Sequence, residues 1–163
     1  MKKLLVLLIL SLCLIGTTSA GEVDTNILKL KALNACKSCN LKGTDYSEAD
    51  LKYANLSGAD LSGSNLSGAD LYAAEFSRAN LSGTDLSGTD LRNVDLTGAD
   101  LIDSDLTDAD LRDADLSYAN LSGANLKNAD LGGWNLIGEG AKLINADLSG
   151  ANLSGANLKN ADL

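Results

Sequence analysis

The chain of 163 residues contains no histidine and no proline, a single tryptophan and only 4% aromatic residues. Because histidine is the commonest general base and metal ligand in proteins, its absence excludes most hydrolase triads and zinc sites. The shortage of aromatic side chains leaves little bulk for an ordinary globular core. The sequence therefore predicts a protein that is not an enzyme, with no catalytic residues, no cofactor and no metal site.

Positive charge is also scarce. The chain has 13 Lys and Arg against 22 Asp and Glu, a net charge of −9. Residues 1–20 contain two of the lysines and no acid, so the remainder carries a net charge of −11. Such a chain has no basic patch with which to bind nucleic acid phosphates. Nucleic acid is therefore not an expected partner.

Residues 1–20 have the three zones of a secretory signal peptide. Lys2 and Lys3 form the basic start, residues 4–15 form an apolar run, and small residues precede Gly21. The run of twelve residues is shorter than the roughly 20 that a membrane-spanning helix needs. We therefore expect cleavage after Ala20, with a retained membrane helix as the alternative.

The expected mature protein is exported and has no stable insertion in a membrane. Its compartment would be the periplasm, the thylakoid lumen or the cell exterior, which the sequence does not separate. Cys13 could indicate a lipoprotein, but Leu12 stands where a lipoprotein signal would carry a small residue.

From Asn40 onward the apolar residues recur every five positions, which fits neither the helical period of 3.6 nor the strand period of 2. There are 25 such positions, of which 23 are Leu, and the residue two positions before is Ala in 17 of the 25. Asp or Asn stands just before almost every Leu. A five-residue unit cannot bury its Leu alone, so the units must stack into a continuous core, with the Leu and the small residue facing inward. The polar residues then form outward-facing turns.

Units such as Ala59-Asp60-Leu61-Ser62-Gly63 make residues 39–163 resemble the pentapeptide-repeat family, whose consensus is A(D/N)LXX. The resemblance implies an all-β fold, a right-handed quadrilateral parallel β-helix with four repeats per coil. Twenty-five repeats would give about six coils and a rod about 30 Å long at the spacing of paired strands.

Residues 21–38 precede the repeats and are expected to form a linker and a cap. Ile27, Leu28, Leu30 and Leu33 lie near helical spacing, and a solenoid end needs cover. We predict a helical cap over residues 26–35, with a frayed linker as the alternative.

Cys36 and Cys39 are the two cysteines that remain after cleavage. An exported location and an even count favour a disulfide between them. The repeat register places Cys36 in a Leu position and Cys39 in a small-residue position, so both are expected to face inward beside the cap. The alternatives are a thioredoxin-like redox pair, which lacks its βαβ context, and half of a zinc site.

One segment interrupts the repeats. Two extra residues fall near 137–142, and four glycines lie between Gly132 and Gly140. Trp134 occupies a small-residue position that its ring cannot fill. We interpret the segment either as a tolerated surface insertion or as a loop that presents Trp134 to a partner.

The C-terminal unit Ala161-Asp162-Leu163 is in perfect register and has no helix after it. Such a coil leaves apolar side chains uncovered. We expect two copies to meet end to end through the coil around Leu163, with an incomplete reading frame as the alternative.

With four repeats per coil, residues twenty apart fall on one face. One column of the expected rod is entirely acidic and is a candidate partner-binding surface: Asp50, Asp70, Asp90, Asp110 and Asp130. Three further acids, Asp103, Asp108 and Asp113, fall on a single coil.

Three functions follow from these patterns. The first is a rigid interaction or structural module with an unknown protein partner. The second comes from the family resemblance, which includes members that mimic DNA and protect DNA gyrase; the signal peptide counts against it because gyrase is cytoplasmic. The third is weak divalent-cation binding along the Asp column, since hard cations prefer carboxylate oxygens.

Overall fold

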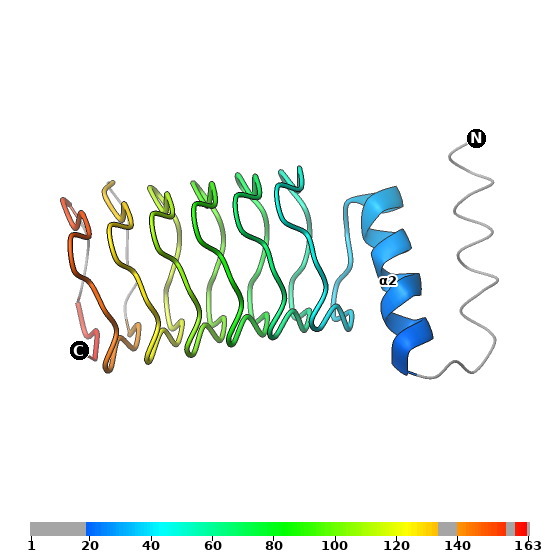
Figure 1. The fold of residues 1–163 in the computed structure, drawn as a ribbon. Coiled ribbons are helices and arrows are strands. Elements are labelled where there is room, and N and C mark those ends of the chain that lie inside the picture. The colour runs from blue at the N-terminus through cyan, green and yellow to red at the C-terminus, as the bar shows by residue number, and fades with distance from the viewer. Residues whose placement is uncertain (1–18, 134–139, 156–158, 163) are drawn as a thin grey trace.

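The computed structural model describes residues 19–133, 140–155 and 159–162. Helix α2, Ser19–Leu33, lies across one end of a stack of similar coils, and residues 159–162 lie at the opposite end (Figure 1). The predicted signal peptide falls almost entirely outside the described residues. Among the helices within the described ranges, none is long and apolar enough to cross a membrane.

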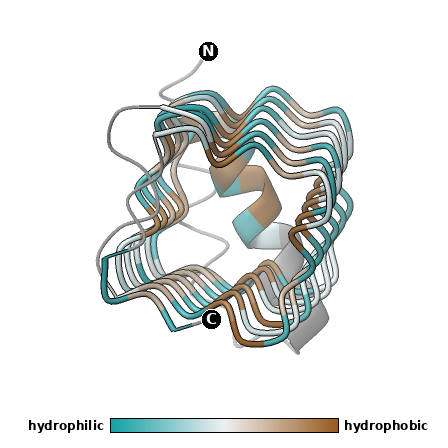
Figure 2. Cartoon of the chain, turned by 90° about the vertical axis from the view of Figure 1, so that its left-hand side faces the viewer, coloured by the Kyte–Doolittle hydropathy of each residue, from teal (hydrophilic) through white to brown (hydrophobic). Residues whose placement is uncertain are grey.

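Each coil contains twenty residues and has four sides (Figure 2). Parallel bridges join residues twenty apart, from Ala35 with Asn55 to Asp110 with Asp130. The predicted four repeats per coil are thereby confirmed. Each bridge is isolated, so neighbouring coils pair at every fifth residue and the described residues form no longer strand.

The predicted two-residue insertion appears as a change of offset between paired residues. Asn120 pairs with Lys142, twenty-two positions on, and the offset returns to twenty between Lys142 and Asp162. The coil after the insertion therefore regains the register of the coils before it.

A four-residue turn carries the chain round each corner, as Leu61-Ser62-Gly63-Ser64 illustrates. The Ser64 amide donates to the Leu61 carbonyl at 3.0 Å, and Gly63 has a φ of +64°. A positive φ at the third residue is typical of a type II turn and explains why glycine is common there. The Asp60 carboxylate accepts the Ser62 amide at 3.0 Å. This last bond explains why Asp or Asn precedes nearly every Leu.

The interior is a stack of Leu alternating with small residues, as the period predicts. Almost every Leu position from residue 41 to residue 131 is less than 2% exposed, and Phe76 fills its position completely buried. Ser and Thr in the small positions keep their hydroxyls bonded; Ser64, for example, donates to the Leu61 carbonyl at 2.6 Å. Burying each Leu stabilises the fold by about 1.5–3 kcal/mol, so the stack is the main source of stability.

Helix α2 covers the first coil but begins earlier than residue 26 and ends at Leu33, two residues before the predicted end. Asn34 ends it with a φ of +50°, the left-handed conformation common after a helix C-terminus. Leu30 is 1% exposed and Ile27 packs against the core, whereas Leu28 and Leu33 are about half exposed. Only two of the four apolar residues in the predicted cap therefore face the coil, because a helix turns the other two to its outer side.

Candidate functional site

The five residues of the predicted acidic column stack one per coil along the rod. Parallel bridges join each residue to the next in the order Asp50, Asp70, Asp90, Asp110 and Asp130. We call the side of the rod formed by this column and the residues two positions further along the Asp face. Those neighbouring residues are Lys52, Tyr72, Arg92 and Arg112.

Four of the five acids of the Asp face, Asp70, Asp90, Asp110 and Asp130, form ion pairs with Lys52, Arg92 or Arg112, which the sequence analysis did not foresee. Lys52 Nζ lies 2.8 Å from Asp70, one coil further on. Arg92 lies 2.5 Å from Asp90 and 3.6 Å from Asp110. Its guanidinium thus connects two consecutive coils.

Arg112 repeats this arrangement one coil along the rod. It lies 2.6 Å from Asp110 and 3.7 Å from Asp130. Three bases therefore accompany the five acids of the column, so its negative charge is partly offset.

The arginines also alter the acids that they contact. The hydrogen bond from Arg92 lowers the pKa of Asp90, and the bond from Arg112 lowers the pKa of Asp110. In both cases the hydrogen bond from the guanidinium outweighs partial burial, which acts in the opposite direction. Both carboxylates consequently stay ionised at a lower pH than an ordinary Asp.

Tyrosines extend the Asp face at its N-terminal half. The rings of Tyr53 and Tyr72 meet edge to face with centroids 5.7 Å apart. The Arg92 guanidinium lies 5.5 Å from the centroid of the Tyr72 ring. Tyr53 is 66% exposed, so an aromatic surface is presented to solvent beside fixed charges.

The side that precedes the Asp face along each coil has different chemistry. We call it the Ser face, and its outer row consists mainly of Ser and Thr: Ser47, Ser67, Ser87, Thr107, Lys127 and Ser149. Four of these hydroxyls, on Ser67, Ser87, Thr107 and Ser149, donate to the Asn or Asp two positions before. The Ser face therefore satisfies its own polar groups, while the Asp face carries aromatic and arginine side chains.

Cys36 and Cys39 form a disulfide and are both buried, as the repeat register predicts. The bond lies under α2, where Lys29 Nζ is 3.8 Å from Cys39 Sγ. This position fits a structural link at the junction between the helix and the first coil.

The other predicted features are less informative. Trp134 and Leu163 lie outside the described residues. Asp103, Asp108 and Asp113 occupy successive corners with positive φ, and Asp108 accepts a hydrogen bond from Asn128 at 3.0 Å. In the described part of the chain, no three His, Cys, Asp or Glu side chains gather as metal ligands would.

The sequence held the signal for the charge pairing. Bases occur two residues after an Asp of the column at Lys52, Arg92 and Arg112, and a two-residue spacing around a turn keeps both side chains on one side. Reading the residue after each Leu of the column, as well as the residue before it, would have revealed these bases.

Comparison with known proteins agrees with this geometry. The family model described as pentapeptide repeats matches eight copies at residues 36–68, 74–113, 95–133 and 139–163, together more than half of the chain. A comparison with curated protein sequences found no match.

Several solved structures are similar. A pentapeptide repeat protein from the Arabidopsis thaliana thylakoid lumen is 32% identical, with a TM-score of 0.56 over 61% of this chain and 66% of that one, slightly under two thirds of its length. Full-length QnrB1, a plasmid-mediated fluoroquinolone resistance protein, is 22% identical, with a TM-score of 0.65 over 79% of this chain and 72% of that one. At this identity the second likeness concerns the fold alone. The repeated family match and the twenty-residue coils together show that the chain belongs to the pentapeptide-repeat family.

Proposed function

We propose that this protein is an exported, non-catalytic scaffold that binds a protein partner through the Asp face. The observation that carries the proposal is the cluster of Tyr53, Tyr72 and Arg92 on coils that backbone hydrogen bonds join to one another. Tyrosine and arginine dominate the energetic centres of protein interfaces. Because backbone bonds between coils fix their spacing, the cluster loses little conformational freedom on binding.

Partner capture tests this role. Exported proteins from the source cells are passed over the immobilised mature protein and over a variant carrying Tyr53→Ala and Tyr72→Ala. We expect the mature protein to capture a partner that cross-links to the Asp face. The tyrosine variant should not capture this partner. The matched control carries Ser67→Ala and Ser87→Ala on the Ser face and should retain it. Retention by the tyrosine variant, or loss with the serine variant, contradicts the proposal.

Export is supported by the composition of residues 1–20. A solved structure with 32% identity is that of a protein from the thylakoid lumen. Cell fractionation with N-terminal sequencing tests this part. We expect the mature chain to begin at Gly21 in an exported compartment, and a cytoplasmic pool with an intact N-terminus would contradict it.

The alternative is an acidic DNA mimic that acts on a DNA-binding enzyme such as gyrase. The ion pairs of Arg92 and Arg112 weigh against it, because they offset part of the negative charge of the column that would imitate phosphates. We expect a molar excess of the mature protein to leave gyrase supercoiling unchanged. Inhibition of supercoiling would favour the alternative.

We also propose that two copies associate end to end around Leu163. The coil before it supports this arrangement, since the core residues Leu148 and Leu153 are only partly buried, whereas almost every Leu position from residue 41 to residue 131 is less than 2% exposed. Sedimentation equilibrium should show a dimer that Leu148→Lys disrupts. A monomer at all concentrations would contradict the proposal.

A further inference from the structure

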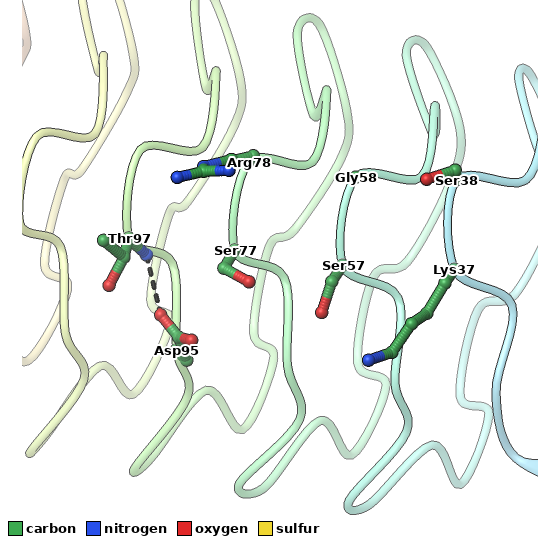
Figure 3. A pocket seen from close by; sticks show the side chains of 8 residues that line it. All are labelled: Lys37, Ser38, Ser57, Gly58, Ser77, Arg78, Asp95 and Thr97. Atoms are coloured by element: carbon green, nitrogen blue, oxygen red, sulfur yellow. Dashed lines mark hydrogen bonds between the residues drawn. The ribbon is translucent and has the colours of Figure 1, made fainter.

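A groove lies on the side of the rod opposite to the Ser face, near the end that α2 covers. It has a volume of about 450 Å³ and is lined by Lys37, by the hydroxyl-bearing residues Ser57, Ser77 and Thr97 on the following coils, and by Arg78 beside Ser77 (Figure 3). The three hydroxyl residues share one column, one per coil. The groove therefore runs along the rod and offers a hydrogen-bonding group at each coil.

The two cations of the groove differ from those of the Asp face. Lys52, Arg92 and Arg112 are all held in ion pairs, whereas Lys37 and Arg78 make none with the described residues. Both are exposed. Two positive charges that the fold does not use are notable in a protein with a net charge of −9.

The negative charge of the rod is concentrated in its middle. Residues 19–54, which form α2 and the first coil, contain five lysines and five acids, while residues 95–115 contain eight aspartates and one arginine. An anionic ligand is therefore repelled less at the end that carries Lys37 than at the middle of the rod.

The spacing of the two cations constrains the shape of the ligand. Lys37 and Arg78 lie two coils apart, with the coil of Ser57 between the coil of Lys37 and the coil of Arg78. Two coils correspond to about 10 Å at the spacing of paired strands. In a polyproline II peptide, side chains three residues apart lie on one side at about 9.3 Å, whereas same-side residues of a β-strand are about 6.6 Å or 13 Å apart.

The groove also suits a polyproline II backbone. Such a peptide has no internal hydrogen bonds, so its amides and carbonyls are free to bond outside. The hydroxyls of Ser77 and Thr97 provide partners for them, whereas the Ser57 hydroxyl already donates to Asn55 at 2.9 Å and is left to accept. Gly58 has a φ of +66°, and an added Cβ would lie 3.2 Å from Ser38 Oγ, which is a tight contact.

Asp95 limits where the acids of the ligand can lie. It borders the groove beside Thr97, whose amide donates to it at 2.9 Å (Figure 3). A ligand carboxylate near Asp95 would be repelled, so the acids must lie between Lys37 and Arg78. The Asp95 carboxylate is placed to accept a hydrogen bond from a donor group at the end of the ligand instead.

We propose that the groove between Lys37 and Arg78 binds an acidic peptide segment in the polyproline II conformation, with carboxylates three residues apart. The inference rests on the proposed function as a protein-binding scaffold and names a second contact surface for the partner. It uses residues distinct from the Asp face, so the two surfaces can be tested separately.

Fluorescence anisotropy with labelled synthetic peptides and the mature protein tests the groove. The probe contains about four Glu-Pro-Pro repeats. One control peptide replaces Glu with Gln, and another has the same composition with its Glu residues adjacent. We expect the first peptide to bind at least about tenfold more tightly than either control, with an affinity that falls as salt rises.

Variants identify the site of binding. Lys37→Gln combined with Arg78→Gln should weaken binding of the Glu-Pro-Pro peptide by about tenfold or more. Lys127→Gln removes an exposed lysine from the Ser face and should leave binding unchanged. Equal binding of the Glu and Gln peptides, or unchanged binding by the double variant, overturns the proposal.

Two further results separate the proposals. An oligouronate that binds the groove more tightly than any peptide would overturn the peptide assignment in favour of an anionic glycan. Loss of peptide binding in the double variant, with the Tyr53 and Tyr72 variant still binding the peptide, supports the groove even if partner capture through the Asp face fails.

Discussion

The two ends of the rod bury their core residues to different extents. At the first coil, Cys36 and Leu41 are completely buried beneath α2 and the disulfide. At the last described coil, Leu143 is 3% exposed, but Leu148 and Leu153 are only partly buried. Both coils follow the same five-residue register. Burial in a solenoid thus depends on having a neighbour on each side, and a helix can replace a missing coil.

The largest expected effect comes from a Leu with neighbours on both sides. Leu96 is completely buried, and bridges on either side hold its coil between those of Phe76 and Leu116. Leu96→Ala should lower the free energy of unfolding by about 3 kcal/mol, because it removes apolar contact and leaves a cavity. The same change at partly buried Leu153 should cost about 1 kcal/mol. Equal losses in denaturant unfolding would contradict the comparison.

The cap provides a second contrast, within one helix. Leu30→Ala should lower the free energy of unfolding by about 2 kcal/mol, since Leu30 is 1% exposed against the first coil. Leu28→Ala is the matched control, and its effect should stay within about 0.5 kcal/mol because Leu28 is 51% exposed. A similar cost for both variants would show that the helix does not act as a cover.

The disulfide should contribute somewhat less. It closes a short loop between Cys36 and Cys39, so reduction is expected to lower the free energy of unfolding by about 2 kcal/mol on the chain-entropy estimate. A variant with Cys36→Ser and Cys39→Ser should show no response to reductant. If reduction leaves unfolding of the native protein unchanged, the link is not structural.

The smallest expected effect concerns the ion pairs of the Asp face. Because Arg92 lowers the pKa of Asp90, the pair stabilises the fold at pH values above the unfolded pKa of about 3.9, and this contribution is lost as the pH falls through the lower folded value. Arg92→Gln should therefore raise the midpoint of acid unfolding, by less than about half a pH unit for an exposed pair.

Arg78→Gln is the control for this measurement, since Arg78 makes no ion pair with the described residues. Its acid unfolding should match that of the unmodified protein. A downward shift of the midpoint with Arg92→Gln would mean that the pairing does not stabilise the folded state.

The repeat period predicts most of the fold because one local rule recurs at every corner. The five-residue spacing of Leu places Leu61 and Leu86 in the core, and the register assigns even Cys36 and Cys39 correctly. The helix was less predictable, because a periodic apolar pattern does not say which two of its residues meet the coil. Leu28 and Leu33 fit the pattern equally well and are exposed.

The candidate binding surfaces were harder to predict from the sequence than the fold. The Asp column follows from the period, but its pairing with Arg92 depends on side-chain direction at a turn, which spacing alone does not give. The groove between Lys37 and Arg78 depends on residues 41 positions apart. Only the stacking of coils brings such residues to the same side of the rod.

Hydrogen exchange resolved along the chain tests the central claim most directly, at a concentration where sedimentation shows a monomer. The amides that bond between coils should be strongly protected from Cys36 to Leu131, including the first coil beneath α2, and less protected in residues 141–155. Uniform protection to the last coil, or exchange that begins at the first coil, would contradict the account.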